Sequence, residues 1–350
     1  MRALILLSVL FVLSLPVATS ANVFGLGPGL TNLETVPVGN PGNVANTEIG
    51  ADGTSGYGSV GYGYRMGKFE VTAGQYTDFL EKVAATDTYG LYNSLMWSAP
   101  SASGAQIQRL GSSGSYTYSV AADWANRPVN YVSYWDACRF ANWLHNGQPT
   151  GLQNALTTED GAYTLNGYNG FGGTTIQRNP GAKWFLPSED EWYKAAYYDP
   201  NKSGGEGYWD YPTKSDSAPA NQVVVPDPGN SANYYTTSYS IGSPYYRTDA
   251  GEFENSASPY DTYDQGGNVY EFNEANVYSG ADYIGRGMRG GSFTQSIGAI
   301  NLHASVRYGK GPGYDGSYIG FRVGAVPEPS SLIALGTGIL GLAGLIRRRR

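Results

Sequence analysis

The chain of 350 residues is short of cysteine, histidine and charged side chains. Its one cysteine excludes a disulfide within the chain, and its two histidines exclude a metal centre built from three histidines. Charged residues make up 15% of the chain, and the 29 acidic residues outnumber the 22 basic ones. Five of the arginines, Arg2 and those at 347–350, lie at the two ends, which we expect to be removed; no basic patch is left in the rest to neutralise phosphates, so we expect no nucleic-acid partner.

Glycine and tyrosine are abundant instead, with 49 and 30 residues. This composition predicts many turns and a surface of aromatic and small polar groups rather than long charged helices. Three long segments rich in glycine, serine, tyrosine and asparagine carry aromatic residues throughout, which favours loops packed on a core over free linkers. These segments are 99–118, 150–180 and 200–258. Because no repeat of solenoid length is present, the simplest arrangement is one α+β domain with long loops.

The range 22–64 is rich in glycine, asparagine, proline and valine, and it predicts strands joined by turns. The alternation of Val60, Tyr62 and Tyr64 fits an edge strand. Three helices are predicted further on by capping boxes, in which a hydroxyl side chain precedes an acid or amide by three residues. The pairs are Thr72 with Gln75, Ser133 with Asp136, and Ser188 with Glu191. Apolar residues follow each pair at helical spacing, so one face of each helix is expected in the core.

The beginning of the chain predicts export. The range 1–21 opens with Arg2, continues as an apolar run and finishes in small residues. This layout is typical of a secretory signal peptide, which we expect to be cleaved near Ala21. A membrane anchor that stays uncleaved is the less favoured alternative, because the apolar run is short.

The end of the chain combines Pro327, Glu328 and Pro329 with the uncharged apolar range 332–346 and four terminal arginines. A helix of this length is short for a hydrocarbon core of about 30 Å, and the arginines favour a cytoplasmic end. The range 326–350 resembles the PEP-CTERM sorting signal of Gram-negative bacteria; an ordinary tail anchor is the alternative. The resemblance implies export through the inner membrane, transient membrane insertion, recognition by an exosortase that cuts near the Pro-Glu-Pro residues, and a place on the outer surface or in the extracellular matrix.

The strongest local chemistry lies in YDQGGNVYEF, the range 263–272. Asp264 and Glu271 bracket a Gly-Gly-Asn turn. A turn that exposes carbonyl oxygens between two carboxylates suits a hard cation such as calcium, which takes six or more oxygen ligands. On spacing alone, an ordinary hairpin turn followed by a strand is an equally good interpretation.

Six segments between residues 64 and 323 form an ordered series: GKFEVTAGQYTDFL, RPVNYVSYWDACRFANWL, WFLPSEDEWYKAAYY, YDQGGNVYEF, MRGGSF and IGFRV. In this order they resemble the signature blocks of the formylglycine-generating enzyme, or sulfatase-modifying factor, family. Each block alone is a weak signal, but their shared order makes chance agreement improbable. The resemblance implies the family's compact α+β fold, which is related to C-type lectins and has little regular secondary structure. We therefore expect the range 22–325 to form one such domain.

In that family the block with the Gly-Gly-Asn turn holds a structural calcium ion. The resemblance implies that Asp264 and Glu271 supply carboxylate ligands. Gly267 and Val269 would add backbone oxygens. The ligand positions are intact, although tyrosine and phenylalanine replace the two tryptophans usual in the block. The candidates for a second calcium site of the family are Asn233 and Tyr234.

The loop MRGGSFTQSIGAINLHASVRYG, the range 288–309, matches the catalytic loop of the family. In formylglycine generators two cysteines of this loop bind copper(I), a soft metal that prefers thiolates. Gln295 and Ile300 stand at these positions, so copper is not expected here. The only thiol, Cys138, follows Ala137 on a helix face predicted to be buried, which favours a core cysteine over a reactive one.

Polar residues of the same loop are candidates for a ligand cleft, where the family binds an extended peptide. The candidates are Ser292, Gln295, Ile300, Asn301, Arg289 and Arg307. For the two arginines, the favoured interpretation is a structural one in which they tie loops to buried acids. A Ser-His-Asp arrangement has no nucleophile elbow to support it.

Together these features predict an exported surface or matrix protein with the sulfatase-modifying factor fold, which binds a glycan or a protein without catalysis. Aromatic faces beside amide and hydroxyl groups suit such ligands. The alternative is an enzyme of the family, either a formylglycine generator that acts by an altered mechanism or another oxidative enzyme that uses a bound metal.

Overall fold

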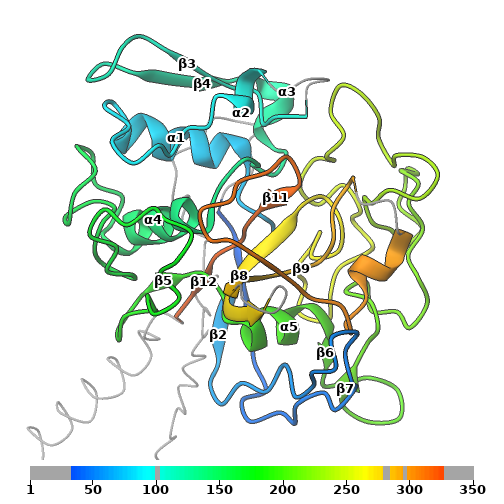
Figure 1. Cartoon of the computed structure of the whole chain (residues 1–350). Helices are drawn as coiled ribbons and strands as arrows, with labels where there is room; N and C mark the ends of the chain where they lie inside the picture. Colours follow the sequence, from blue (N-terminus) through cyan, green and yellow to red (C-terminus); the bar gives the residue numbers. More distant parts are fainter. Residues whose placement is uncertain (1–32, 99–102, 279–283, 295–297, 327–350) are drawn as a thin grey trace, which may run out of the picture.

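The architecture comes from a computed structural model, which describes residues 33–98, 103–278, 284–294 and 298–326 (Figure 1). The predicted signal peptide and the predicted apolar helix within 332–346 lie outside the described residues. Among the described residues, no helix is long and apolar enough to cross a membrane.

Two four-stranded sheets form the centre of the fold. The first has the order β1-β2-β12-β5 and is antiparallel throughout. In it β12, which comes last in the chain, lies between the earlier strands β2 and β5. The second has the order β10-β9-β8-β11, with β11 parallel to β8. The strands of the first sheet are β1 (Thr35–Val38), β2 (Tyr64–Gly67), β12 (Gly324–Ala325) and β5 (Trp184–Phe185). Those of the second are β10 (Tyr308–Lys310), β9 (Ile284–Arg289), β8 (Tyr270–Tyr278) and β11 (Ile319–Gly320).

Three longer helices begin where the sequence predicts them. Each has a complete capping box, in which the hydroxyl of Thr72, Ser133 or Ser188 accepts a backbone N–H and the third helical residue bonds back to the cap. These helices are α1 (Ala73–Val83), α4 (Tyr134–His145) and α5 (Glu189–Tyr197). The short elements are α2 (Leu95–Ser98), α3 (Ala122–Ala125), η2 (Gly298–Leu302), and the strand pairs β3 (Ile107–Leu110) with β4 (Thr117–Val120) and β6 (Tyr198–Asp199) with β7 (Gly207–Tyr208).

The edge strand predicted from Val60, Tyr62 and Tyr64 is wrong in two respects. The strand begins only at Tyr64, and β2 is an inner strand, because β1 pairs with one of its sides and β12 with the other. The second partner comes from the far end of the chain, which local alternation cannot reveal. The preceding range 39–63 contains an isolated bridge between Asn46 and Tyr57 rather than further strands.

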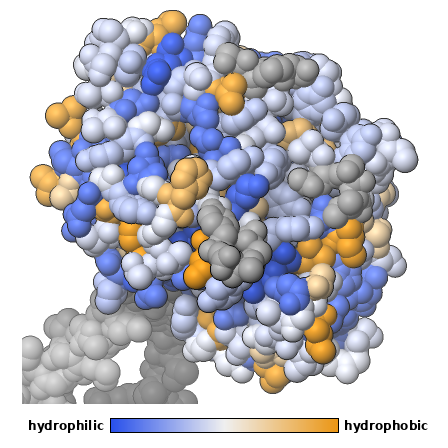
Figure 2. Space-filling model, in the orientation of Figure 1, coloured by the Kyte–Doolittle hydropathy of each residue, from blue (hydrophilic) through white to orange (hydrophobic). Residues whose placement is uncertain are grey.

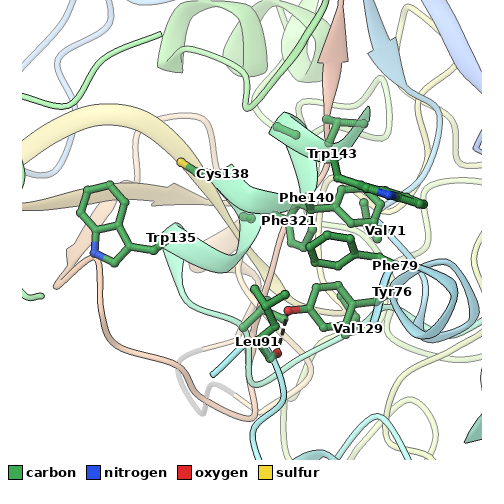
Figure 3. Close-up of a cluster of buried hydrophobic side chains, with 14 of the residues drawn as sticks. Val71, Tyr76, Phe79, Leu91, Val129, Trp135, Cys138, Phe140, Trp143 and Phe321 are labelled. Carbon is green, nitrogen blue, oxygen red and sulfur yellow. Dashed lines mark hydrogen bonds between the residues drawn. The ribbon is translucent and has the colours of Figure 1, made fainter. Parts of the chain in front are cut away.

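The main core is aromatic and lies between α1, α4 and the C-terminal segment (Figure 3). Phe140 is fully buried, and its ring centroid lies 5.3 Å from that of Phe79 and 5.4 Å from that of Phe321. These edge-to-face contacts stabilise the core beyond the burial of apolar area alone. Cys138 lies on the same helix with no exposed surface, and burial raises the pKa of its thiol above the ordinary value, so the expected core cysteine is confirmed.

The surface drawn in Figure 2 carries its apolar residues as small groups among hydrophilic ones. Isolated apolar residues are normal on a soluble domain. The exposed Phe171, for example, has 63% of its surface accessible. The exposure of an aromatic residue alone therefore does not indicate a binding site.

Replacing the central core ring tests this account of stability. We expect Phe140→Ala to lower the free energy of unfolding by about 3–5 kcal/mol, because it removes buried apolar surface and leaves a cavity. The matched change Phe171→Ala, at an exposed ring, should stay within about 0.5 kcal/mol of the original protein. Urea unfolding followed by fluorescence measures both, and a loss below about 1 kcal/mol for Phe140→Ala would contradict the assignment of the core.

Candidate functional site

A tight glycine turn, residues 290–293, follows β9 and forms the centre of the candidate site. Gly290 and Gly291 both have left-handed backbones, with φ of 93° and 72°. A Cβ atom on Gly290 would lie 2.5 Å from the carbonyl oxygen of Gln265, and one on Gly291 would lie 2.8 Å from the side chain of Leu302. Only glycine fits these positions, so the turn packs directly against both η2 and residues 263–271, which we call the acidic turn.

Among the described residues, two buried polar groups in and next to this turn have no hydrogen-bond partner. Ser292 is 1% exposed and Asn301 2% exposed, and neither the Ser292 hydroxyl nor the Asn301 Nδ2 group is paired. The two residues lie on adjacent segments, because a Cβ atom on Gly291 would come within 3.1 Å of the Asn301 Cβ atom. Leaving a buried polar group unpaired costs about 1–3 kcal/mol, so a water molecule or a polar ligand group that reached these two atoms would stabilise the turn.

Ile300 and Gln295 are two further cleft candidates of this loop. Ile300 is 46% exposed on η2, beside Asn301, whereas Gln295 lies outside the described residues. The Oδ1 atom of Asn301 accepts a hydrogen bond of 3.0 Å from the hydroxyl of Tyr308 on β10. The ring of Tyr308 in turn lies 5.6 Å from that of the buried Tyr270 on β8, measured between centroids. One side of the turn is therefore bordered by tyrosines of the second sheet.

On the other side, Phe293 leads into a chain of aromatic rings from the range 233–246, which we call the tyrosine-rich loop. The centroid of Phe293 is 5.9 Å from that of Tyr246, which is 4.9 Å from that of Tyr239. Tyr239 is 40% exposed and lies 4.9 Å from Tyr235 by the same measure. The loop has no charged residue, and its other side chains are mainly hydroxyls.

Arg289 and Arg307 both pair with the buried Glu189. The Nε atom of the buried Arg289 lies 2.8 Å from a carboxylate oxygen of Glu189, and its Nη1 atom donates to the carbonyls of Ala304 and Val306. Arg307 reaches the other oxygen of Glu189 at 2.6 Å. The structural interpretation of both arginines is confirmed, because a single buried acid from α5 holds them.

The acidic turn places Asp264 and Glu271 in different surroundings. Glu271 has no exposed surface; one of its oxygens accepts bonds of 2.6 Å from Arg322 Nε and Trp192 Nε1, and the other accepts a bond of 2.6 Å from Arg322 Nη2. Asp264 keeps some exposed surface and accepts a 2.7 Å bond from the backbone N–H of Gly251. Burial of its carboxyl group raises the pKa of Asp264 to about 6. Glu271 is thus hydrogen-bonded to Arg322 and Trp192, and its role as a calcium ligand stays a prediction.

Glu70 is a residue of this region that the sequence analysis missed. It is 1% exposed, and neither of its carboxylate oxygens has a partner. Burial, and next the charge of Asp264, raise the pKa of Glu70 well above its ordinary value. The only available signal was an acid between the apolar Phe69 and Val71 at the start of the first block. A buried carboxylate without a hydrogen-bond partner is costly in its charged form unless a positive charge balances it.

The other predicted calcium ligands have mixed surroundings. Gly267 donates its backbone N–H to the carbonyl of Gly290, which links the acidic turn to the glycine turn, and Val269 is buried in the core. Asn233 donates to the Oδ1 atom of Asn268 at 2.7 Å, while its own Oδ1 atom is buried without a partner. The carbonyl of Tyr234 accepts a 3.3 Å bond from Asn221. Within the described ranges, no group of three or more His, Cys, Asp and Glu side chains is placed to hold a metal ion.

A model of the sulfatase-modifying factor enzyme 1-like domain matches residues 40–325, and a model of the PEP-CTERM protein-sorting motif matches residues 325–350. Comparison with curated proteins gives no match. Similar solved structures include CarF (21% identity, 85% of this chain and 99% of that one, TM-score 0.45) and variable protein 1 of Treponema denticola (17%, 84% and 95%, TM-score 0.47). PvdO from Pseudomonas aeruginosa is a third, with 18% identity, coverage of 84% and 92%, and a TM-score of 0.41.

The raised pKa of Asp264 predicts a pH dependence of stability. A carboxyl whose pKa rises from 3.8 to about 6 on folding binds its proton more tightly in the folded state. Its contribution to the free energy of unfolding therefore falls as pH rises from about 4 to about 6. In the presence of chelator, Asp264→Asn should therefore gain stability relative to the original protein by roughly 2 kcal/mol across this interval.

Asp261→Asn is the matched control, since this carboxyl has a side chain that is 74% exposed in the same segment. Urea unfolding at a series of pH values gives the difference between each variant and the original protein. Parallel curves for Asp264→Asn and Asp261→Asn would show that Asp264 titrates in the same way in the folded and unfolded states.

Proposed function

Because the chain belongs to the sulfatase-modifying factor enzyme 1-like domain family and ends in a PEP-CTERM protein-sorting motif, we propose that it is an exported module that binds a ligand without transforming it. The motif indicates export and a location on the surface or outside of a Gram-negative bacterium. The observation that carries the proposal is the pair of unpartnered buried groups, Ser292 Oγ and Asn301 Nδ2, beside the aromatic chain that starts at Phe293.

The absence of a second thiol supports a non-catalytic role. Copper(I) needs soft ligands, and the positions that the family fills with cysteine are Gln295 and Ile300. The only cysteine of the chain, Cys138, is fully buried on α4. Burial raises the pKa of its thiol, which disfavours the thiolate that either metal binding or nucleophilic chemistry requires.

The ligand we propose is a glycan or a protein segment that lies along the glycine turn and the tyrosine-rich loop. Tyrosine rings offer flat apolar area next to a hydroxyl, and they lose little conformational entropy on binding. Ser292 and Asn301 would supply the hydrogen bonds that fix the orientation of the ligand at one end. The exposed Tyr239 would supply stacking area at the other.

We also propose a structural calcium ion at the acidic turn, held by Asp264 together with Glu70. Glu70 is a buried carboxylate without a hydrogen-bond partner, and a cation is the simplest way to stabilise its charged form. Bound calcium would supply the positive charge that holds the carboxylates of Glu70 and Asp264 together, and so would link the segment before α1 to the acidic turn. Asn233 and Tyr234 as a second calcium site stay a prediction.

Sorting follows from the end of the chain. The PEP-CTERM motif implies processing by an exosortase, and we propose that the cut falls near Pro327, Glu328 and Pro329. We propose in addition that the uncharged range 332–346 holds the chain in the membrane before this cut.

Ligand binding is tested with the segment 22–325 on a glycan array and a peptide array. For any ligand found, Ser292→Ala should weaken binding by roughly 3- to 10-fold, the effect of one lost hydrogen bond. Its free energy of unfolding should be unchanged or higher, because the hydroxyl has no partner in the free protein.

The matched control is Ser112→Ala, at an exposed serine of the turn between β3 and β4 and outside the proposed binding surface, which should leave both quantities unchanged. Equal affinity of Ser292→Ala and the original protein would place the ligand elsewhere. Formation of an aldehyde from a sulfatase-type cysteine peptide with copper(I), detected by mass spectrometry, would overturn the non-catalytic role and establish the enzyme alternative.

Calcium binding is tested by thermal melting with calcium and with chelator. A ligand that binds only the folded state stabilises it by about 2.7 kcal/mol at a hundredfold excess over its dissociation constant, so the melting temperature should rise clearly with calcium. The rise should vanish in Asp264→Ala and in Glu70→Gln, and should persist in Asp261→Asn. A rise that survives in Asp264→Ala would show that the ion binds at another place.

A further inference from the structure

We propose that the face around Val326, where the chain leaves the folded domain, lies against the lipid headgroups of the membrane while the sorting tail is attached. We call this the exit face and define it by Tyr62, Pro180, Lys183, Trp184 and Val326. The inference goes beyond ligand binding, and it rests on the proposal that the range 332–346 is held in the membrane.

The point of exit is fixed by the sheet. β12 pairs with β2 on one side and with β5 on the other, so Gly324 and Ala325 lie between two strands. A Cβ atom on Gly324 would come within 2.4 Å of the Phe185 ring, which shows how closely the strand is packed. The backbone N–H of Val326 then donates a 3.0 Å bond to the carbonyl of Lys183. The chain is therefore held by the domain up to the last residue before the Pro-Glu-Pro motif.

The tether from this point to the apolar range is short. Only Pro327, Glu328, Pro329 and two serines separate Val326 from Leu332. Five residues span at most about 18 Å when fully extended. A domain anchored by the range 332–346 must therefore keep its exit face close to the bilayer surface, whichever way the tether turns.

The exit face has the chemistry of a surface that meets lipid headgroups. A hollow of about 350 Å³ opens there, and its lining includes Tyr62, Pro180, Phe185 and Val326. None of its ten lining residues carries a carboxylate, although acidic residues predominate in the chain. Tyr62 is 52% exposed and Val326 44% exposed. Tyrosine and tryptophan are enriched at membrane interfaces, where an apolar ring with a polar edge suits the headgroup region.

The positive charge of this face comes from Lys183 rather than from the arginine in the hollow. Arg178 forms ion pairs of 2.6 Å with Glu191 and 2.7 Å with Glu274, so two carboxylates outnumber its single positive charge. Lys183 is exposed, and it lies next to Trp184 in β5, at the edge of the first sheet. An exposed lysine beside aromatic residues favours a surface that carries anionic lipids.

The experiment uses the mature chain, residues 22–350, in vesicles of phosphatidylcholine and phosphatidylglycerol that contain a headgroup-labelled nitroxide lipid as quencher. A fluorophore is attached to cysteine in Pro180→Cys at the exit face, in Ser331→Cys next to the apolar range, or in Ser238→Cys. Ser238 belongs to the tyrosine-rich loop, which lies on the side of the domain away from β5 and β12 (Figure 1). The buried Cys138 is protected from the label.

We expect strong quenching at positions 331 and 180 and little at 238. Adding Lys183→Glu to Pro180→Cys should reduce quenching in vesicles with phosphatidylglycerol, and should change it less in vesicles of phosphatidylcholine alone. Quenching at 331 without quenching at 180 would overturn the proposal, and cross-linking of position 180 to the exosortase in cells would then assign the exit face to the enzyme.

Failure of quenching at both 331 and 180 would show that the tail is not held in the membrane, and it would overturn the exit-face proposal together with that premise. The ligand-binding proposal would be unaffected, because its arrays use the segment 22–325 without the tail. Equal quenching at 180 and 238 would show adsorption without a preferred face and would also overturn the proposal.

Discussion

The buried ion pair between Glu271 and Arg322 is the interaction on which the rest of the structure depends. Arg322 approaches both oxygens of Glu271 at 2.6 Å, and its Nη1 and Nη2 groups also donate to the carbonyls of Gly67 and Tyr263. One guanidinium thus joins the end of β2, the acidic turn and β8. Because a buried charge left without its partner is costly, each of these segments must keep its place for the others to keep theirs.

The position of the glycine turn depends on the segments that this ion pair holds together. The N–H of Gly267 donates to the carbonyl of Gly290, and the N–H of Phe293 donates to the carbonyl of Asn268. The turn that presents Ser292 is therefore hydrogen-bonded at two points to the acidic turn. The tyrosine-rich loop is held by hydrogen bonds as well as by contacts between rings: Asn233 donates to Asn268, and Asn221 donates to the carbonyl of Tyr234.

Sequence patterns predicted the local features of this site well. The three capping boxes placed the helices correctly, the tie between Arg289 and a buried acid agreed with the favoured interpretation, and the order of six blocks identified the family. Patterns did less well where the partner of a group comes from a distant segment. The segment around Glu271 was equally well interpreted as a cation site or as a hairpin turn followed by a strand, and neither interpretation indicated that Arg322 pairs with Glu271. The local sequence does not indicate that Glu70 is buried, because an acid between two apolar residues in a strand-like segment is usually exposed.

The sequence by itself determined where helices begin, where glycine alone can turn the chain, and that no second thiol exists for copper chemistry. These properties depend on a residue and its near neighbours, or on composition, and so need no knowledge of the fold. Only the tertiary structure decided which carboxylates are neutralised, which polar groups are buried without partners, and that the strand before the sorting signal is enclosed by two others. Charge, burial and pairing are properties of contacts between segments far apart in the chain, and those contacts exist only once the chain has folded.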